Sequence, residues 1–361
     1  MNKETYKLYA DCIPVKGYFR SVIMDLTRKK YLFIPNNLCD ILQQKVLINK
    51  RNLDVSYFGL LVDNEIIFKC AFSESLLYPP LNTTWEVPNL ISNAILEIGN
   101  NLDHILKAIQ ELLMLGCRHF LWIYKKKMSN EELEILLNST KTSIALTIEV
   151  YVPYDENTDI ELLWETLNKH NRISYVLFYK SSHTQILSQS GVRGNIVFYN
   201  KDIDYAKSNI HWGNINVNMP LYTESLHYNT FFNRKVCINE EGDVFNYFTQ
   251  NESFGNIHTE KLEKIIKKRN FQKLWTITKD TILTCSVCEF RYMCVDSRIP
   301  VQIKDGHWQH LTSCTYNPYI CKWQGEEGYV PVEECGIYSR ETGFVPDKKK
   351  IAKLNKMIWG E

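Results

Sequence analysis

Four cysteines in the last third of the chain restrict its fold more than any other feature. Cys285, Cys288 and Cys294 are spaced C-x2-C-x5-C, and Cys314 follows at a distance. A C-x-x-C pair places two sulfurs on one tight turn, and two more thiolates complete the four-ligand cage that Zn²⁺ or an iron–sulfur cluster needs. The spacing therefore predicts one metal centre on these four cysteines, and by itself it allows either metal.

The cysteines outside this motif follow no ligand spacing, although the chain has eleven cysteines in all. Buried free thiols behave as small apolar side chains. The thiols expected to pack in this way are Cys12, Cys39, Cys70, Cys117 and Cys237. Cys321 and Cys335, in the tail, are reserve candidates for ligation. His307 and His310 could supply an imidazole near Cys314, although such histidines more often pack or face solvent.

Charge and hydropathy exclude several classes of partner. Forty-two basic and 41 acidic side chains leave a net charge of +1, which is too small to attract nucleic acid through a long-range field. The N-terminus has no apolar core of signal-peptide length, and no stretch approaches the roughly 20 apolar residues that span a bilayer. We therefore expect a cytoplasmic protein with neither a nucleic-acid nor a membrane partner, whose thiols stay reduced.

The length of 361 residues favours two or three domains. In the first, short runs rich in β-branched and aromatic residues predict strands over 6–17, 20–26 and 31–34. Asn36 or Asn37 can cap a following helix that has one apolar face. A second hairpin is predicted over 55–71, around the turn pair Asp63-Asn64.

From about residue 100, strands alternate with helices. Asn101 caps a helix that Gly116 ends. Strands are predicted over 119–124, 143–152, 173–179 and 195–199, with helices at 131–137 and 159–169 between them. Such alternation with mostly apolar strands implies parallel pairing. Four units are too few for a closed eight-unit barrel, so we expect an open or partial (βα) barrel.

Around residue 230 the pattern changes to a hairpin over 236–245 and a helix over about 260–274. This hairpin with its Gly242, the turn at 254–257 and the cysteine motif resemble the SPASM domain of peptide-modifying enzymes. More narrowly, the maturase of grasp-with-spasm peptide systems is similar over 12–17, 31–35, 279–280, 288–292 and 316–319. The resemblance covers most of the chain.

In that family a SPASM domain can carry two auxiliary [4Fe–4S] clusters, and the four cysteines match the ligand set of the second. The first cluster is expected to be lost, because Tyr247 and a position near Ser297 stand where it needs thiolates. The resemblance thus implies one [4Fe–4S] cluster, with Zn²⁺ as the alternative. Arg291, inside the motif, could offset the negative charge of the thiolates from outside the ligand set.

Radical S-adenosylmethionine enzymes of that family bind their catalytic cluster through C-x3-C-x2-C, and this sequence has no such triplet. We therefore expect no site for S-adenosylmethionine, and we interpret the alternating region as a scaffold. The N-terminal strands and helix resemble the small winged-helix element that holds a leader peptide as an added edge strand.

Together these features predict an α/β chain with a winged-helix-like leader-binding domain over 1–95, a partial (βα) barrel over 96–230, and a SPASM-like metal-binding domain with its tail over 231–361. The expected function is peptide maturation, in which the chain binds the leader of a ribosomally made precursor and acts with an ATP-grasp ligase. The sequence identifies no catalytic residue. A tailoring enzyme that uses an auxiliary cluster and a zinc-stabilised interaction protein are the alternatives.

Because no cysteine triplet offers an open iron, S-adenosylmethionine should not be cleaved by this protein. Anaerobically reconstituted protein, incubated with reductant and the cofactor, is expected to release no 5′-deoxyadenosine above a protein-free control. Chromatography of the reaction mixture measures this, and release above the control would contradict the prediction.

Overall fold

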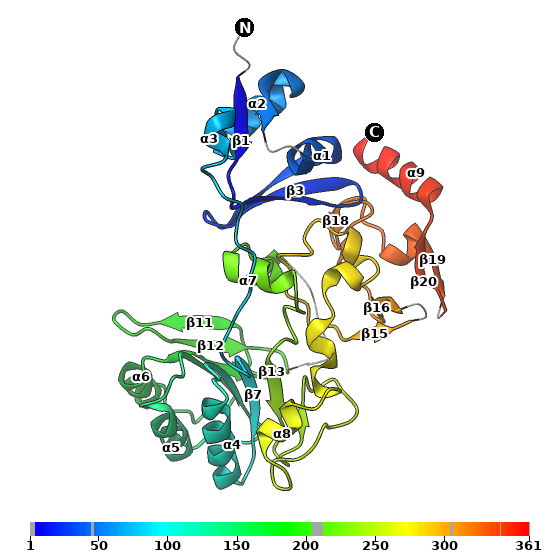
Figure 1. The fold of residues 1–361 in the computed structure, drawn as a ribbon. Coiled ribbons are helices and arrows are strands. Elements are labelled where there is room, and N and C mark those ends of the chain that lie inside the picture. Colours follow the sequence, from blue (N-terminus) through cyan, green and yellow to red (C-terminus); the bar gives the residue numbers. More distant parts are fainter. Residues whose placement is uncertain (1–3, 45–46, 204–211, 304–305, 340, 361) are drawn as a thin grey trace. The chain divides into compact units, whose positions relative to one another are not determined.

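The computed structural model describes residues 4–44, 47–203, 212–303, 306–339 and 341–360, which fold into two compact units (Figure 1). Unit 1 combines Met1–Trp85, Ser208–Phe231 and Thr276–Glu361, and unit 2 combines Glu86–Lys207 and Phe232–Trp275. Both units mix helices with sheets, which confirms the α/β class. The division into three domains stays a prediction. In the structure, the first and last segments of the chain belong to the same compact unit, unit 1.

The described part of unit 2 contains one eight-stranded sheet with the order β11-β12-β10-β9-β8-β7-β13-β14. Its parallel strands are β7 (Asn93–Ile98), β8 (His119–Tyr124), β9 (Thr147–Pro153), β10 (Ile173–Tyr179), β12 (Asn195–Tyr199) and β13 (Lys235–Ile238). The antiparallel edges are β11 (Gln185–Ser188) and β14 (Val244–Phe245). The open, mostly parallel sheet agrees with the partial barrel that alternation predicted.

One face of this sheet packs against helices. They are α4 (Leu102–Met114), α5 (Asn130–Thr140), α6 (Ile160–Lys169) and α8 (Leu262–Ile266). Figure 1 shows α4, α5 and α6 together on that face. Alternate strand residues such as Leu96, Trp122 and Val150 are fully buried in the same apolar cluster as these helices. The side chain of Asn101 accepts a hydrogen bond from the His104 N–H, so it caps α4 as predicted.

The helix predicted over 260–274 is wrong in its length. The structure has the short α8, which ends at Ile266, and then a separate 3₁₀ segment, Phe271–Thr276. The side chain of Asn270 accepts the Phe271 backbone N–H at 3.0 Å. A local bond of this kind competes with the helical hydrogen-bond pattern, which explains why the helix does not continue.

In unit 1 the predicted meander is present. It consists of β2 (Cys12–Lys16), β3 (Arg20–Asp25) and β4 (Lys30–Pro35), which form an antiparallel sheet of that order, followed by α1 (Asn36–Gln44). A second small sheet has the order β5-β1-β6, with β1 (Thr5–Leu8), β5 (Ile48–Asn49) and β6 (Ile67–Lys69). Sheets and helices of this size agree with the fold class predicted for the N-terminal region.

The hairpin predicted over 55–71 is wrong in its first half. Residues Val55–Asp63 form a helix, α2, and only the second half is a strand, β6. The Asp54 carboxylate accepts the Ser56 N–H at 2.8 Å and so caps the first turn. A short apolar run fits either a strand or a helix, and here the cap and the burial of Leu61 decide for the helix.

The remaining helices and strands of unit 1 are mostly short. They are α3 (Phe72–Ser75), α7 (Met219–Ser225), β15 (Pro300–Gln302), β16 (Trp308–His310), β17 (Tyr316–Asn317), β18 (Lys322–Trp323), β19 (Gly336–Ser339), β20 (Gly343–Pro346) and α9 (Lys348–Trp359). Among the described helices, none combines the length and the apolar character needed to cross a bilayer.

Gly116, which follows α4, should be one of the glycines of unit 2 that tolerate substitution poorly. Its φ is +89°, and an added Cβ would lie 2.8 Å from Asn89 Cβ. Gly191 is a matched control, because its φ is +83° but no atom lies within 4 Å of an added Cβ. Both alanine variants should lose about 1 kcal/mol from the left-handed backbone, and Gly116→Ala should lose about 1 kcal/mol more. Urea unfolding measures the two losses, and equal losses would contradict this account.

Candidate metal centre

The C-x-x-C pair lies on a tight turn, as its spacing predicted. Cys285 begins the 3₁₀ segment Cys285–Val287, and the Cys288 N–H donates to the Cys285 carbonyl at 2.9 Å. Thr284, just before the turn, has a φ of +68°, so the chain enters the turn through a residue with an uncommon positive φ. Further along, the backbone of Cys294 forms an isolated bridge with Ile215. Backbone bonds therefore fix the turn that carries the first two thiols.

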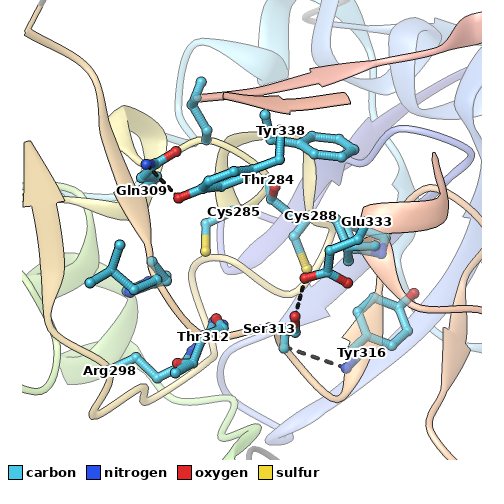
Figure 2. Close-up of a pocket in the computed structure, with 17 residues that line it drawn as sticks. Thr284, Cys285, Cys288, Arg298, Gln309, Thr312, Ser313, Tyr316, Glu333 and Tyr338 are labelled. Carbon is cyan, nitrogen blue, oxygen red and sulfur yellow. Dashed lines mark hydrogen bonds between the residues drawn. The ribbon is translucent and has the colours of Figure 1, made fainter. Parts of the chain in front are cut away.

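Three of the four predicted ligands line one cavity of about 660 Å³, including its open mouth. They are Cys285, Cys288 and Cys314. Figure 2 shows the sulfurs of Cys285 and Cys288 turned into this cavity. Cys294 does not line the cavity. Its thiol is nevertheless close enough to Cys285 and Cys314 for their charges to raise its pKa. The four thiols therefore lie in one region, but among the described residues no three of their sulfurs lie within 4.8 Å of one another, and their role as ligands stays a prediction.

Burial makes these thiols hard to ionise without a cation. It raises the pKa of Cys285 to about 12 and the pKa of Cys288 well above its usual value, and neighbouring thiolates act in the same direction. A soft metal ion that binds the thiolates would remove this electrostatic cost. The donor set therefore fits Zn²⁺ or an iron–sulfur cluster, and Cys285, Cys288, Cys294 and Cys314 are the residues that would hold it.

A buried ion pair that sequence reasoning missed lies beside the thiols. Arg298 donates to both carboxylate oxygens of Asp296, from Nη2 to Oδ2 at 2.7 Å and from Nε to Oδ1 at 3.0 Å. Burial alone would raise the pKa of Asp296, but the Arg298 charge holds it well below its usual range. The same guanidinium lowers the pKa values of Cys285 and Cys314, against the larger effect of burial. Arg298 therefore supplies a positive charge next to the proposed thiolates.

His310, on β16, lies in the same group of side chains. The metal-binding atoms of Cys285, Asp296 and His310 all lie within 4.8 Å of one another. Burial lowers the pKa of His310 to about 4, although the Asp296 carboxylate acts in the opposite direction. The signal in the sequence was the pair of charged residues, Asp296 and Arg298, placed between the third and fourth cysteines.

Arg291 lies at the cysteine turn, where its side chain binds backbone carbonyls. Its Nη1 donates to the Cys288 carbonyl at 3.0 Å and to the Lys16 carbonyl at 2.7 Å, and its Nε pairs with Asp280 at 3.0 Å. Arg291 is not among the residues that line the cavity. The idea that its charge offsets the thiolates stays a prediction.

The cysteine turn is also fastened to the hairpin between β2 and β3. The Tyr18 N–H donates to the Val287 carbonyl at 2.8 Å. Arg20 Nε pairs with Glu289 Oε1 at 2.9 Å, and the Glu289 side chain is 0% exposed. Tyr316 donates its hydroxyl to the same carboxylate oxygen. The residue that follows Cys288 is therefore anchored by the first strands of the chain.

The remaining cysteines pack in apolar surroundings. The thiols predicted to be buried, and found so, are Cys12, Cys39, Cys70, Cys117 and Cys237. Cys321 is buried in a cluster with Phe290, and Cys335 is fully buried, with its sulfur accepting from Asn317 Nδ2 at 3.2 Å. These surroundings favour packing for both reserve candidates.

Known proteins offer little similarity to this chain. No family model matches the sequence, and no curated protein matches it. Among solved structures, SuiB of Streptococcus suis aligns over 80% of this chain and 94% of its own, at 8% identity and a TM-score of 0.27. A similarity this weak carries no argument about fold or function, so the conclusions rest on the residues of this chain.

Replacing Cys288 by serine should remove the metal centre and destabilise the surrounding module. Structural metal binding can contribute on the order of 10 kcal/mol to folding, which is comparable with the net stability of a domain. Cys70→Ser is the matched control, because Cys70 is a buried thiol outside the motif. Metal analysis of anaerobically purified wild type and both variants should show loss in Cys288→Ser alone. Equal metal in all three proteins would show that the ligands are assigned wrongly.

Proposed function

We propose that this chain is a peptide-maturation protein that holds the leader of a ribosomally made precursor as an added strand on the outer edge of β4. It would act beside an ATP-grasp ligase that forms ester or amide links on the rest of the precursor. The observation that carries the proposal is the difference between the two edges of the β2-β3-β4 sheet. The link to peptide maturation comes from the resemblance in sequence.

The β2 edge is closed to another strand. Pro14 has no N–H, and its carbonyl accepts Gln43 Nε2 at 3.0 Å. The Lys16 carbonyl accepts Arg291 Nη1, and the Cys12 N–H donates to the Tyr9 carbonyl at 3.1 Å. Most of the backbone groups that could pair with a peptide along this edge are therefore absent or already used.

The β4 edge is open in the part of the chain that the structure describes. Pro14 is opposite Ile23, so the Ile23 backbone groups point away from β2 and pair with Leu32. Because direction alternates along a strand, the N–H and C=O groups of Tyr31 and Phe33 point outward. No described residue forms a hydrogen bond with them. A row of such groups is a template for strand addition.

Side chains beside this edge could give selectivity. The Tyr31 and Phe33 rings contact Phe290 of the cysteine loop, with centroids 5.7 and 6.0 Å apart. Lys29 and Lys30, where β4 begins, are exposed. We therefore expect the bound peptide to carry apolar side chains at alternate positions and acidic side chains toward one end.

Strand addition predicts that peptide binding depends on backbone N–H groups with a period of two. The probe is a synthetic leader encoded by a short peptide gene, where sequencing finds one beside this gene, titrated calorimetrically against the full chain. N-methylation at alternate positions should weaken binding about tenfold or more, because each methyl removes a hydrogen bond and blocks strand approach. Methylation at the positions between should have little effect.

Tyr31→Pro and Tyr31→Ala form the matched pair of protein variants, because only proline removes the outward N–H. Alanine should retain more affinity than proline. If the loss of affinity on N-methylation did not alternate along the peptide, or if the two Tyr31 variants bound the leader equally well, addition at β4 would be excluded. The absence of binding by any such leader would exclude the proposed function.

A further inference from the structure

His310 is a buried polar side chain that neither the four-cysteine centre nor leader binding explains. Its side chain is 6% exposed, and it lines the cavity together with Cys285, Cys288 and Cys314. Its ring nitrogens make no hydrogen bond of accepted geometry with the described residues, although the Ile299 backbone lies close enough to interact with the ring. Burying an unsatisfied polar group costs about 1–3 kcal/mol, so such a group usually acquires a partner in the functional state.

Asp296 is the first acceptor to consider, and Arg298 already occupies it. Nε2 of His310 is 3.4 Å from Asp296 Oδ2, which exceeds the 2.7–3.2 Å of a normal N–H···O bond. Both Asp296 oxygens accept from Arg298 instead. The adjacent guanidinium also makes this carboxylate a poor ligand for a second cation. Within the close group, the Cys285 sulfur remains as the partner for the imidazole.

A metal-bound thiolate would provide the acceptor that the thiol does not. A thiolate carries negative charge, and hydrogen bonds to cluster sulfurs are among the factors that set the reduction potential of an iron–sulfur centre. An N–H donor stabilises the more negative, reduced state and so raises that potential. Groups around a metal site also orient the side chains beside its ligands, and Asp296 and Arg298 lie where they can do this for His310.

We propose that His310 is a positioning residue that donates its ring N–H to the Cys285 sulfur when that sulfur binds the metal. The paired charges of Asp296 and Arg298 lie beside the ring. This inference rests on the proposed metal centre and is independent of leader binding, so its failure and that of the leader proposal are distinguishable.

The test compares wild type with His310→Leu, His310→Gln and His307→Leu. Leucine removes the donor, glutamine retains an amide N–H, and His307 is an exposed histidine on the same β15–β16 hairpin. Each protein is reconstituted anaerobically, its iron and sulfide are counted, and its midpoint potential is measured. His310→Leu should keep its cluster and show a more negative potential, glutamine should restore part of the difference, and His307→Leu should match wild type.

If the purified centre holds zinc, the readout is the rate at which iodoacetamide alkylates the thiolates. Removing an N–H···S bond leaves more charge on sulfur, so His310→Leu should react faster than wild type and His310→Gln should fall between them. An unchanged potential or alkylation rate in His310→Leu would overturn the proposal. Loss of the metal from both His310 variants would also overturn it, because His310 would then act as a ligand or as part of the fold.

Discussion

The buried ion pair between Arg20 and Glu289 is the constraint on which unit 1 depends. A fully buried carboxylate is costly unless a cation and further donors compensate it, and Arg20 and Tyr316 do so at Oε1, whereas Oε2 has no hydrogen-bond partner among the described residues. Because Glu289 directly follows Cys288, this pair ties the cysteine turn to the first hairpin of the chain. The close approach of Gly17, whose added Cβ would lie 3.0 Å from Glu289 Cβ, leaves no room for a larger residue.

This arrangement places both proposed sites in one packed unit. Phe290 contacts the aromatic side chains of β4, while its neighbours Glu289 and Arg291 bind the β2–β3 hairpin. The open strand edge and the cysteine turn therefore share one apolar cluster.

Much of this could be predicted from the sequence, because its signals are local. The C-x-x-C spacing predicted a tight turn, Asn101 predicted the start of α4, and alternation predicted the parallel sheet of unit 2. The errors were also local. The apolar run at 55–62 fits both a strand and a helix, and the Asp54 cap favours the helix. Asn270 interrupts a helical pattern that apolar spacing alone would continue.

By itself, then, the sequence determined the elements, the open α/β class and the set of candidate thiols. Only the tertiary structure decided which residues surround those thiols and which sheet edge is open. Asp296, Arg298 and His310 come together through burial and pairing that leave no period in the sequence. The Arg20–Glu289 pair joins residues far apart in the chain, and such long-range contacts depend on the packed fold and not on any local pattern.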